Sequence, residues 1–171
     1  KYDGNTASMV ADINTGSGSS NPEELTVLNN ELYFEAFDGT NGYELWKYDG
    51  NTASMVADIN TGSGYSYPKG LTVFNNELYF EAFDGTNGYE LWKTDGTTTI
   101  IAADINSGSS DSSPADFVVF NNDLYFVAED GTNGDELWMY DGNIATMVAD
   151  INPGSSDSSP ADFVVFNNEL Y

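Results

Sequence analysis

A short acidic loop recurs three times along the chain and carries oxygen donors suited to a hard cation. In each copy an aspartate, an asparagine and a glutamate are spaced three residues apart in a glycine-containing turn: Asp38, Asn41 and Glu44; Asp84, Asn87 and Glu90; Asp130, Asn133 and Glu136. Calcium binds several carboxylate, amide and carbonyl oxygens together, and this spacing could supply such oxygens to a calcium ion in each loop. The competing interpretation is a plain turn, in which the Asx side chains accept hydrogen bonds from their own backbone.

A second group of oxygen donors lies in the repeated sequence Ala-Asp-Ile-Asn, for example at Asp58 and Asn60. The Asp-x-Asn spacing resembles the start of a calcium loop, which needs a glutamate further along. That glutamate does not recur. The counterparts of Glu23 in the later copies are Lys69, Ala115 and Ala161. The alternative interpretation is a strand end that is capped by side-chain hydrogen bonds.

Aromatic residues stand at fixed positions in the copies, as Trp46, Trp92 and Trp138 and as Tyr33, Tyr79 and Tyr125. Exposed rings can stack on sugars, but fixed strand positions favour packing between repeats. Tyr65 and Tyr67 differ, because they occur in one copy only and lie in a polar loop. They have no obvious core position and could contact a ligand or a neighbouring chain; the alternative, and the more common explanation for such residues, is chance surface exposure.

The composition excludes several classes of function. The chain has 28 acidic and 4 basic residues and a formal net charge of −24, so no basic face can neutralise nucleic-acid phosphates or an anionic membrane. It contains no histidine, cysteine or arginine, which removes imidazole bases, thiol nucleophiles and the usual zinc ligands. Paired carboxylates can hydrolyse glycosides, but nearly the same acids recur in every copy, whereas one active site needs asymmetry. We therefore expect a protein that is not an enzyme, with repeated sites that suit multivalent binding.

The whole chain consists of tandem copies of one unit. Three copies of 46 residues occupy 1–46, 47–92 and 93–138, and a shorter fourth copy occupies 139–171. The first two copies differ at only five positions, four of which lie together in one loop. Residues 1–171 are therefore expected to form a single domain of about 3.7 repeats.

Turn residues divide each copy into four short segments with the alternation typical of strands. In the second copy the expected strands are 71–74, 77–83, 89–94 and 98–105, with Asn75-Asn76 as a two-residue hairpin turn. No segment shows a helical period. Four strands in a repeat of this length are typical of a β-propeller blade, so we expect an all-β propeller with an open or fragmentary ring. A linear array of small β-domains and a β-solenoid are the alternatives.

The run ELWKTDGT at residues 90–97 resembles the repeat of the bacterial ELWxxDGT repeat proteins. The other copies keep most of this run, although Asn51 and Asn143 replace its final threonine. The resemblance covers the whole chain. It implies a secreted or cell-surface bacterial protein made of propeller-like repeats, and it implies no particular activity.

These observations predict a non-catalytic extracellular module with a structural, adhesive or assembly role. A fourth blade is expected to have its first strands at the C-terminus and its last strand at 6–13, so we expect a fragment of a larger protein or a ring completed by a partner. Its partners would be copies of itself or the remainder of a longer chain. The alternative function is a calcium-dependent lectin with one glycan site per blade.

Overall fold

The computed structural model describes all residues from Lys1 to Tyr171 and contains fourteen β-strands and no helix. Sheet 1 contains β1 (Glu23–Leu28), β2 (Glu31–Phe37), β3 (Tyr43–Tyr48) and β4 (Ala53–Ala57). Sheet 2 contains β5 (Lys69–Phe74), β6 (Glu77–Phe83), β7 (Tyr89–Thr94) and β8 (Thr99–Ala103). Sheet 3 contains β9 (Ala115–Phe120), β10 (Asp123–Ala128), β11 (Glu136–Tyr140) and β12 (Ala145–Ala149). A final hairpin pairs β13 (Val165–Phe166) with β14 (Glu169–Leu170).

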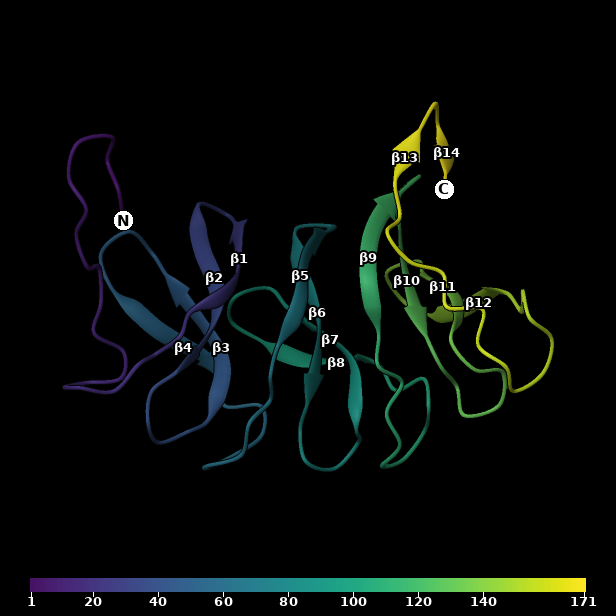
Figure 1. Ribbon diagram of the computed structural model, residues 1–171, viewed down its shortest axis with the longest axis horizontal. Coiled ribbons are helices and arrows are strands. Elements are labelled where there is room, and N and C mark those ends of the chain that lie inside the picture. The colour runs from purple at the N-terminus through teal and green to yellow at the C-terminus, as the bar shows by residue number, and fades with distance from the viewer.

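The strands of each sheet lie in chain order, and each is antiparallel to the strand before it. The three sheets follow one another along the molecule in the same order (Figure 1). Their first strands, β1, β5 and β9, are neighbours. The row of sheets therefore has two free ends, one formed by sheet 1 and the other by sheet 3 with the final hairpin.

The expected all-β class and the four strands per repeat are confirmed. In the second copy β6 and β7 have the expected bounds, and β5 begins two residues before the expected strand. Strand β8 is shorter than expected and ends at Ala103. The reason is local, because the backbone N–H of Ile105 donates to the side chain of Glu90 and not to a neighbouring strand.

The hairpin turn at Asn75-Asn76 is also confirmed. The two residues have φ of 49° and 63°, the left-handed conformation that a tight two-residue turn between twisted strands requires. The same pair forms the turn between the first two strands of sheets 1 and 3 and the turn of the final hairpin, at Asn29-Asn30, Asn121-Asn122 and Asn167-Asn168. Asparagine tolerates this conformation better than other residues with a side chain, which explains why one dipeptide serves all four turns.

The core consists of two hydrophobic clusters that lie between consecutive sheets. One contains Leu28 and Leu45 of sheet 1 together with Leu78 and Phe80 of sheet 2. The other joins sheet 2 to sheet 3, and its members are Phe74, Tyr79, Leu91, Leu124, Phe126, Ala128, Trp138 and Tyr140. Sheet 2 thus contributes both of its faces to the core, because alternate residues of a strand point to opposite sides.

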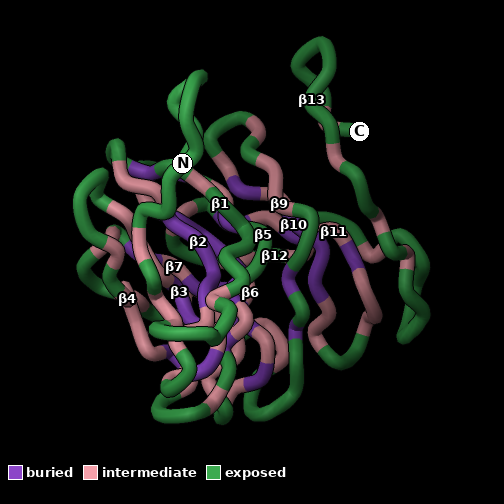
Figure 2. Tube along the Cα trace, turned by 60° about the vertical axis from the view of Figure 1, so that its left-hand side comes forward, coloured by how far each residue is buried: buried purple, intermediate pink, exposed green.

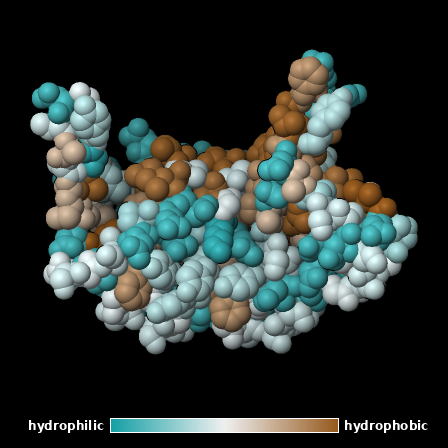
Figure 3. Space-filling model, in the orientation of Figure 1, coloured by the Kyte–Doolittle hydropathy of each residue, from teal (hydrophilic) through white to brown (hydrophobic).

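The two ends of the chain differ from the interior. The segment 6–13 was expected to be a strand, and this is wrong, since it makes only an isolated bridge between Tyr2 and Ala7. In the complete sheets the equivalent strand pairs with a β3-type strand, and none lies beside this segment. Both ends project from the sheets and are largely exposed (Figure 2). In the space-filling view, hydrophobic surface gathers along the edge between the two projecting ends, and the opposite edge is hydrophilic (Figure 3).

Candidate functional site

The repeated acidic loop forms a compact turn that satisfies its own aspartate. Oδ1 of Asp84 accepts hydrogen bonds from the backbone N–H groups of Thr86 and Asn87, both at 2.8 Å. Its other oxygen accepts the side-chain amide of Asn87 at 2.6 Å. Burial raises the pKa of this carboxyl, but these hydrogen bonds outweigh burial and hold the pKa below its usual value. The loops at Asp38 and Asp130 have the same three bonds.

The glutamate of each loop points away from the aspartate and asparagine and into the protein. Glu44 is fully buried, and its Oε2 accepts hydrogen bonds from the Ile59 backbone at 2.8 Å and from the Ser66 hydroxyl at 2.6 Å. Its Oε1 accepts the Ser66 backbone N–H at 3.2 Å. Glu90 has the same arrangement with Ile105 and Ser112. Glu136 accepts through Oε2 alone, from the Ile151 backbone and the Ser158 hydroxyl, and its buried Oε1 has no hydrogen-bond partner.

Burial raises the pKa of Glu44 and Glu90 to about 7, although their hydrogen bonds act in the opposite direction. At Glu136, in sheet 3, the same kinds of hydrogen bond outweigh burial and lower the pKa.

These hydrogen bonds hold the Asp and Asn of each loop together and keep both apart from the Glu of the same loop. Nowhere do three acidic side chains approach closely enough to hold a metal ion. The donor set matches the plain-turn interpretation better than a calcium cage, because its aspartate oxygens already accept hydrogen bonds.

The second oxygen-rich group is also engaged locally. Asp58 Oδ2 accepts the backbone N–H of Gly62 at 3.1 Å, and the side-chain amide of Asn60 donates to the carbonyl of Tyr65 at 3.1 Å. These bonds fold the connection that follows β4, as the capping interpretation predicts.

Four of the six repeated aromatic residues are buried in the core, and the other two, Trp46 and Tyr125, are half-buried. Trp92 and Trp138 are each 9% exposed, and Tyr79 is fully buried. Their side chains belong to the clusters between sheets, which confirms the expectation of packing between repeats.

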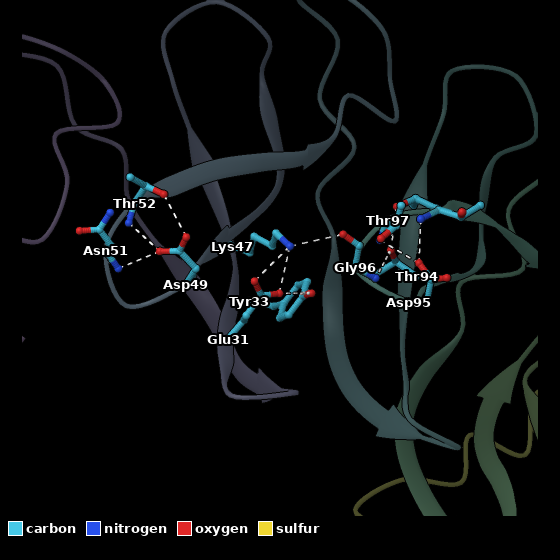
Figure 4. A network of polar contacts seen from close by, with 12 residues as sticks. Glu31, Tyr33, Lys47, Asp49, Asn51, Thr52, Thr94, Asp95, Gly96 and Thr97 are labelled. Atoms are coloured by element: carbon cyan, nitrogen blue, oxygen red, sulfur yellow. Dashed lines mark hydrogen bonds and ion pairs between the residues drawn. The ribbon is translucent and has the colours of Figure 1, made fainter.

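A polar network also joins sheet 1 to sheet 2 (Figure 4). Lys47 forms an ion pair with Glu31 at 3.0 Å and reaches the carbonyl of Gly96, in the turn between β7 and β8, at 3.5 Å. Tyr33 donates to Glu31 at 3.0 Å, and burial together with this bond raises its pKa to about 12. Gly96 has φ of 91°, and a Cβ atom there would collide with the Tyr33 hydroxyl. Glycine is therefore favoured at this contact between the two sheets.

Tyr65 and Tyr67 form part of a cluster of four rings with Phe37 and Tyr43. The rings of Tyr43 and Tyr67 are stacked, with centroids 5.5 Å apart and planes at 20°. Tyr65 packs edge-on against both of them and is still 41% exposed. The sequence singled out Tyr65 and Tyr67, but it gave no sign that they meet residues of the preceding repeat.

Beside this cluster lies a cavity of about 350 Å³ at the junction of sheets 1 and 2. Its lining consists of Asn21, Glu23, Glu24, Glu35, Tyr43, Tyr67 and Lys69. Of these residues, only Tyr67 was singled out as a contact residue from the sequence. For Asn21, Glu23, Glu24 and Lys69 the signal was their place among the positions at which the first two copies differ. Glu35 and Tyr43 had no such signal, because they are identical in the two copies.

Comparison with known proteins gives a fold and no function. The chain matches no protein-family model and no curated protein. Among solved structures it is similar to a computationally designed protein, Ika4, with a TM-score of 0.53 and 16% sequence identity. The match covers 96% of this chain and 91% of that chain. The similarity therefore extends over the whole row of sheets and concerns the fold alone. No helix in the structure is long and apolar enough to span a membrane.

Proposed function

We propose that this chain is a non-catalytic, extracellular module of the β-propeller type, whose sheets are blades and whose role is structural or adhesive. In this proposal the free faces at the two ends of the row bind further blades, supplied by a second copy of the chain. The observation that carries it is the exposure of the outer face of sheet 1.

Equivalent residues on sheets 1 and 2 have very different surroundings. Leu71 of sheet 2 is 8% exposed because sheet 1 covers it, whereas its counterpart Leu25 of sheet 1 is 60% exposed. Val73 and Val27 form a second such pair, at 38% and 63%. The face of sheet 1 that contains Leu25 is therefore exposed, whereas the equivalent face of sheet 2 packs against sheet 1. Exposed apolar faces of this kind mark interaction surfaces.

An apolar hollow of about 320 Å³ accompanies this face, lined by Leu25, Leu32 and Phe34 together with Val10 and Ile13 of the N-terminal segment. At the opposite end, the final hairpin projects with Val164, Phe166 and Tyr171 at 56%, 61% and 61% exposure. Because the two ends differ, association of one with the other is head-to-tail, which gives either a closed ring or an open filament.

The non-catalytic part of the proposal is supported by the repetition of the acidic residues. Glu44, Glu90 and Glu136 have equivalent positions and equivalent serine partners, so none of them is distinguished as a catalytic acid. The extracellular part is supported by the resemblance of residues 90–97 to the ELWxxDGT repeats.

Light scattering of the 171-residue chain over a range of concentrations tests the proposal. We expect dimers or larger particles, and we expect Leu25→Glu to shift the population toward the monomer. The matched control is Ile144→Glu, because Ile144 is 58% exposed but lies in a turn of sheet 3. A monomer at all concentrations, or equal behaviour of the two variants, would show that the outer face of sheet 1 does not bind another copy.

A further inference from the structure

The cavity at the junction of sheets 1 and 2 has properties that the proposed assembly role does not use. Its volume of about 350 Å³ is sufficient for a small organic ligand. Three glutamates, Glu23, Glu24 and Glu35, line it together with one basic residue, Lys69. The lining is therefore net acidic.

Glu35 is the central residue of this cavity. Its side chain is 6% exposed, yet its carboxylate takes part in no hydrogen bond and no ion pair. Glu24 differs, because it accepts the backbone N–H of Gly70 at 2.9 Å. The carboxylate oxygens of Glu35 keep contact with solvent in the cavity, unlike the fully enclosed and unpartnered Oδ1 of Asp58. Glu35 is thus a strong acceptor that is available to a ligand.

The aromatic side of the cavity is held in a fixed geometry. The stacked rings of Tyr43 and Tyr67 both belong to the lining. The Tyr43 hydroxyl accepts the side-chain amide of Asn21 at 2.8 Å, and Tyr65 supports both rings from the side at 5.7 and 5.4 Å between centroids. The faces and edges of these rings are therefore positioned before any ligand arrives.

The cavity lies where the repeats diverge. The first two copies are otherwise identical over 46 residues, and three of their five differences are the pairs Asn21/Tyr67, Glu23/Lys69 and Glu24/Gly70. Five of the seven lining residues belong to these pairs. At the junction of sheets 2 and 3 the equivalent residues line no such cavity. The site is consequently single, although the scaffold is repetitive.

We propose that this cavity binds a guanidinium group, with Glu35 and Glu23 as its anionic partners and Tyr43 and Tyr67 as its aromatic wall. A guanidinium ion is planar, donates paired hydrogen bonds to carboxylates and stacks on aromatic faces. A metal ion fits less well, because no three acidic side chains in the structure approach closely enough to hold one. The net charge of −24 also raises the local concentration of cations.

Titration calorimetry on the full chain with n-propylguanidinium chloride tests this assignment. It is done at pH 8, where the Glu35 carboxyl is ionised, because burial raises its pKa to about 7. We expect saturable binding of one molecule per chain and no binding of butyramide, its neutral analogue. Glu35→Gln should weaken binding at least tenfold. Glu23→Lys should do the same, and it places at position 23 the residue that the second copy carries at 69, so the fold tolerates it. Tyr67→Ser should also weaken binding, because it removes one ring of the aromatic wall. It introduces the residue that the third copy carries at 113.

The matched control is Glu81→Gln, since Glu81 is the counterpart of Glu35 in sheet 2 and does not line the cavity. Its affinity should equal that of the wild type. A second titration with the peptide acetyl-Gly-Arg-Gly-amide identifies the source of the group: tighter binding than n-propylguanidinium indicates an arginine of a partner, and equal binding indicates a free small molecule. Three results would each overturn the proposal: no saturation, equal losses in Glu35→Gln and Glu81→Gln, or calcium binding at Glu35 with no guanidinium binding.

Discussion

The hydroxyl of Ser66 donates a 2.6 Å hydrogen bond to the buried carboxylate of Glu44, across the connection between one repeat and the next. Glu44 lies on β3 of sheet 1, and Ser66 lies in the segment that leads to β5 of sheet 2. The same glutamate also accepts the Ile59 backbone. One side chain therefore fixes the course of the whole connection, which sets the position of the next sheet.

Replacing Ser66 by alanine should destabilise the fold by about 1–3 kcal/mol, because the buried carboxyl of Glu44 would lose the hydrogen bond that it accepts from the Ser66 hydroxyl. Urea denaturation followed by tyrosine and tryptophan fluorescence measures this change. Ser63→Ala is the control, since Ser63 is exposed and lies in the same connection. Equal stability of the two variants would show that the Glu44–Ser66 pair contributes nothing.

Equivalent leucines in sheets 1 and 2 should respond differently to truncation. Leu71→Ala is expected to cost about 2–5 kcal/mol, because Leu71 is 8% exposed and its loss leaves a cavity between sheets. Leu25→Ala should cost less than about 1 kcal/mol in the monomer, because Leu25 is 60% exposed. Denaturation at a concentration where the chain is monomeric makes the comparison. A large loss for Leu25→Ala under those conditions would mean that this face is covered within a single chain.

Stability should fall as pH rises from about 4.5 to 8, because several buried glutamates bind their protons more tightly in the folded state. The pKa values of Glu35, Glu44, Glu81 and Glu90 are each raised to about 7, with burial as the main cause. For a group whose folded pKa exceeds the unfolded value, the stabilisation is present below the unfolded pKa and is lost as pH rises through the folded pKa. Melting temperatures at pH 5, 6, 7 and 8 should therefore decrease in that order.

Glu81→Gln is the control for this pH dependence, because the amide has no proton to lose and Glu81 makes no hydrogen bond that the change would break. The variant should show a shallower decrease between pH 5 and 8. Below about pH 4 stability should fall again, because the turn aspartates have lowered pKa values and then lose their hydrogen bonds. A melting temperature that rises between pH 5 and 8 would contradict the assignment.

Calcium should leave the melting temperature unchanged. The oxygens of Asp84 already accept hydrogen bonds from Thr86 and Asn87, so an ion would have to replace them. Differential scanning calorimetry in calcium and in chelator measures the effect. A rise of several degrees in calcium that Asp84→Asn abolishes would instead support the calcium interpretation of these loops.

The same loops should not confer glycan binding. Asp84 and Asn87 are bonded to each other at 2.6 Å, which leaves them poorly arranged as ion-mediated sugar ligands. A glycan array probed in calcium with the wild type and with an Asp84→Ala/Asn87→Ala variant decides the matter. Signals that the double variant loses would favour the lectin function over the structural one.

The strands and turns could be predicted from the sequence because their causes are local. Asn75-Asn76 adopts the positive φ of the turn through its own conformational preference, and β6 follows from alternation within seven residues. Thr86 and Asn87 lie next to Asp84, so the hydrogen-bonded turn was one of the interpretations that spacing allowed. Burial of Trp92 and Trp138 also followed from their fixed positions on strands, whereas Trp46 of sheet 1 is only half-buried.

The sequence by itself determined the repeat, the all-β class and the turn chemistry, since each depends on neighbours within a few residues. Only the tertiary structure decided what Glu44 and Glu35 do. Both stand in acidic, strand-forming sequence, but Glu44 meets Ser66, 22 residues away, while Glu35 meets no donor at all. The cavity beside Glu35 likewise joins Asn21 to Tyr67, which are brought together by packing of one sheet on the next. Sequence spacing does not report such contacts, because they depend on how two separately folded sheets are placed.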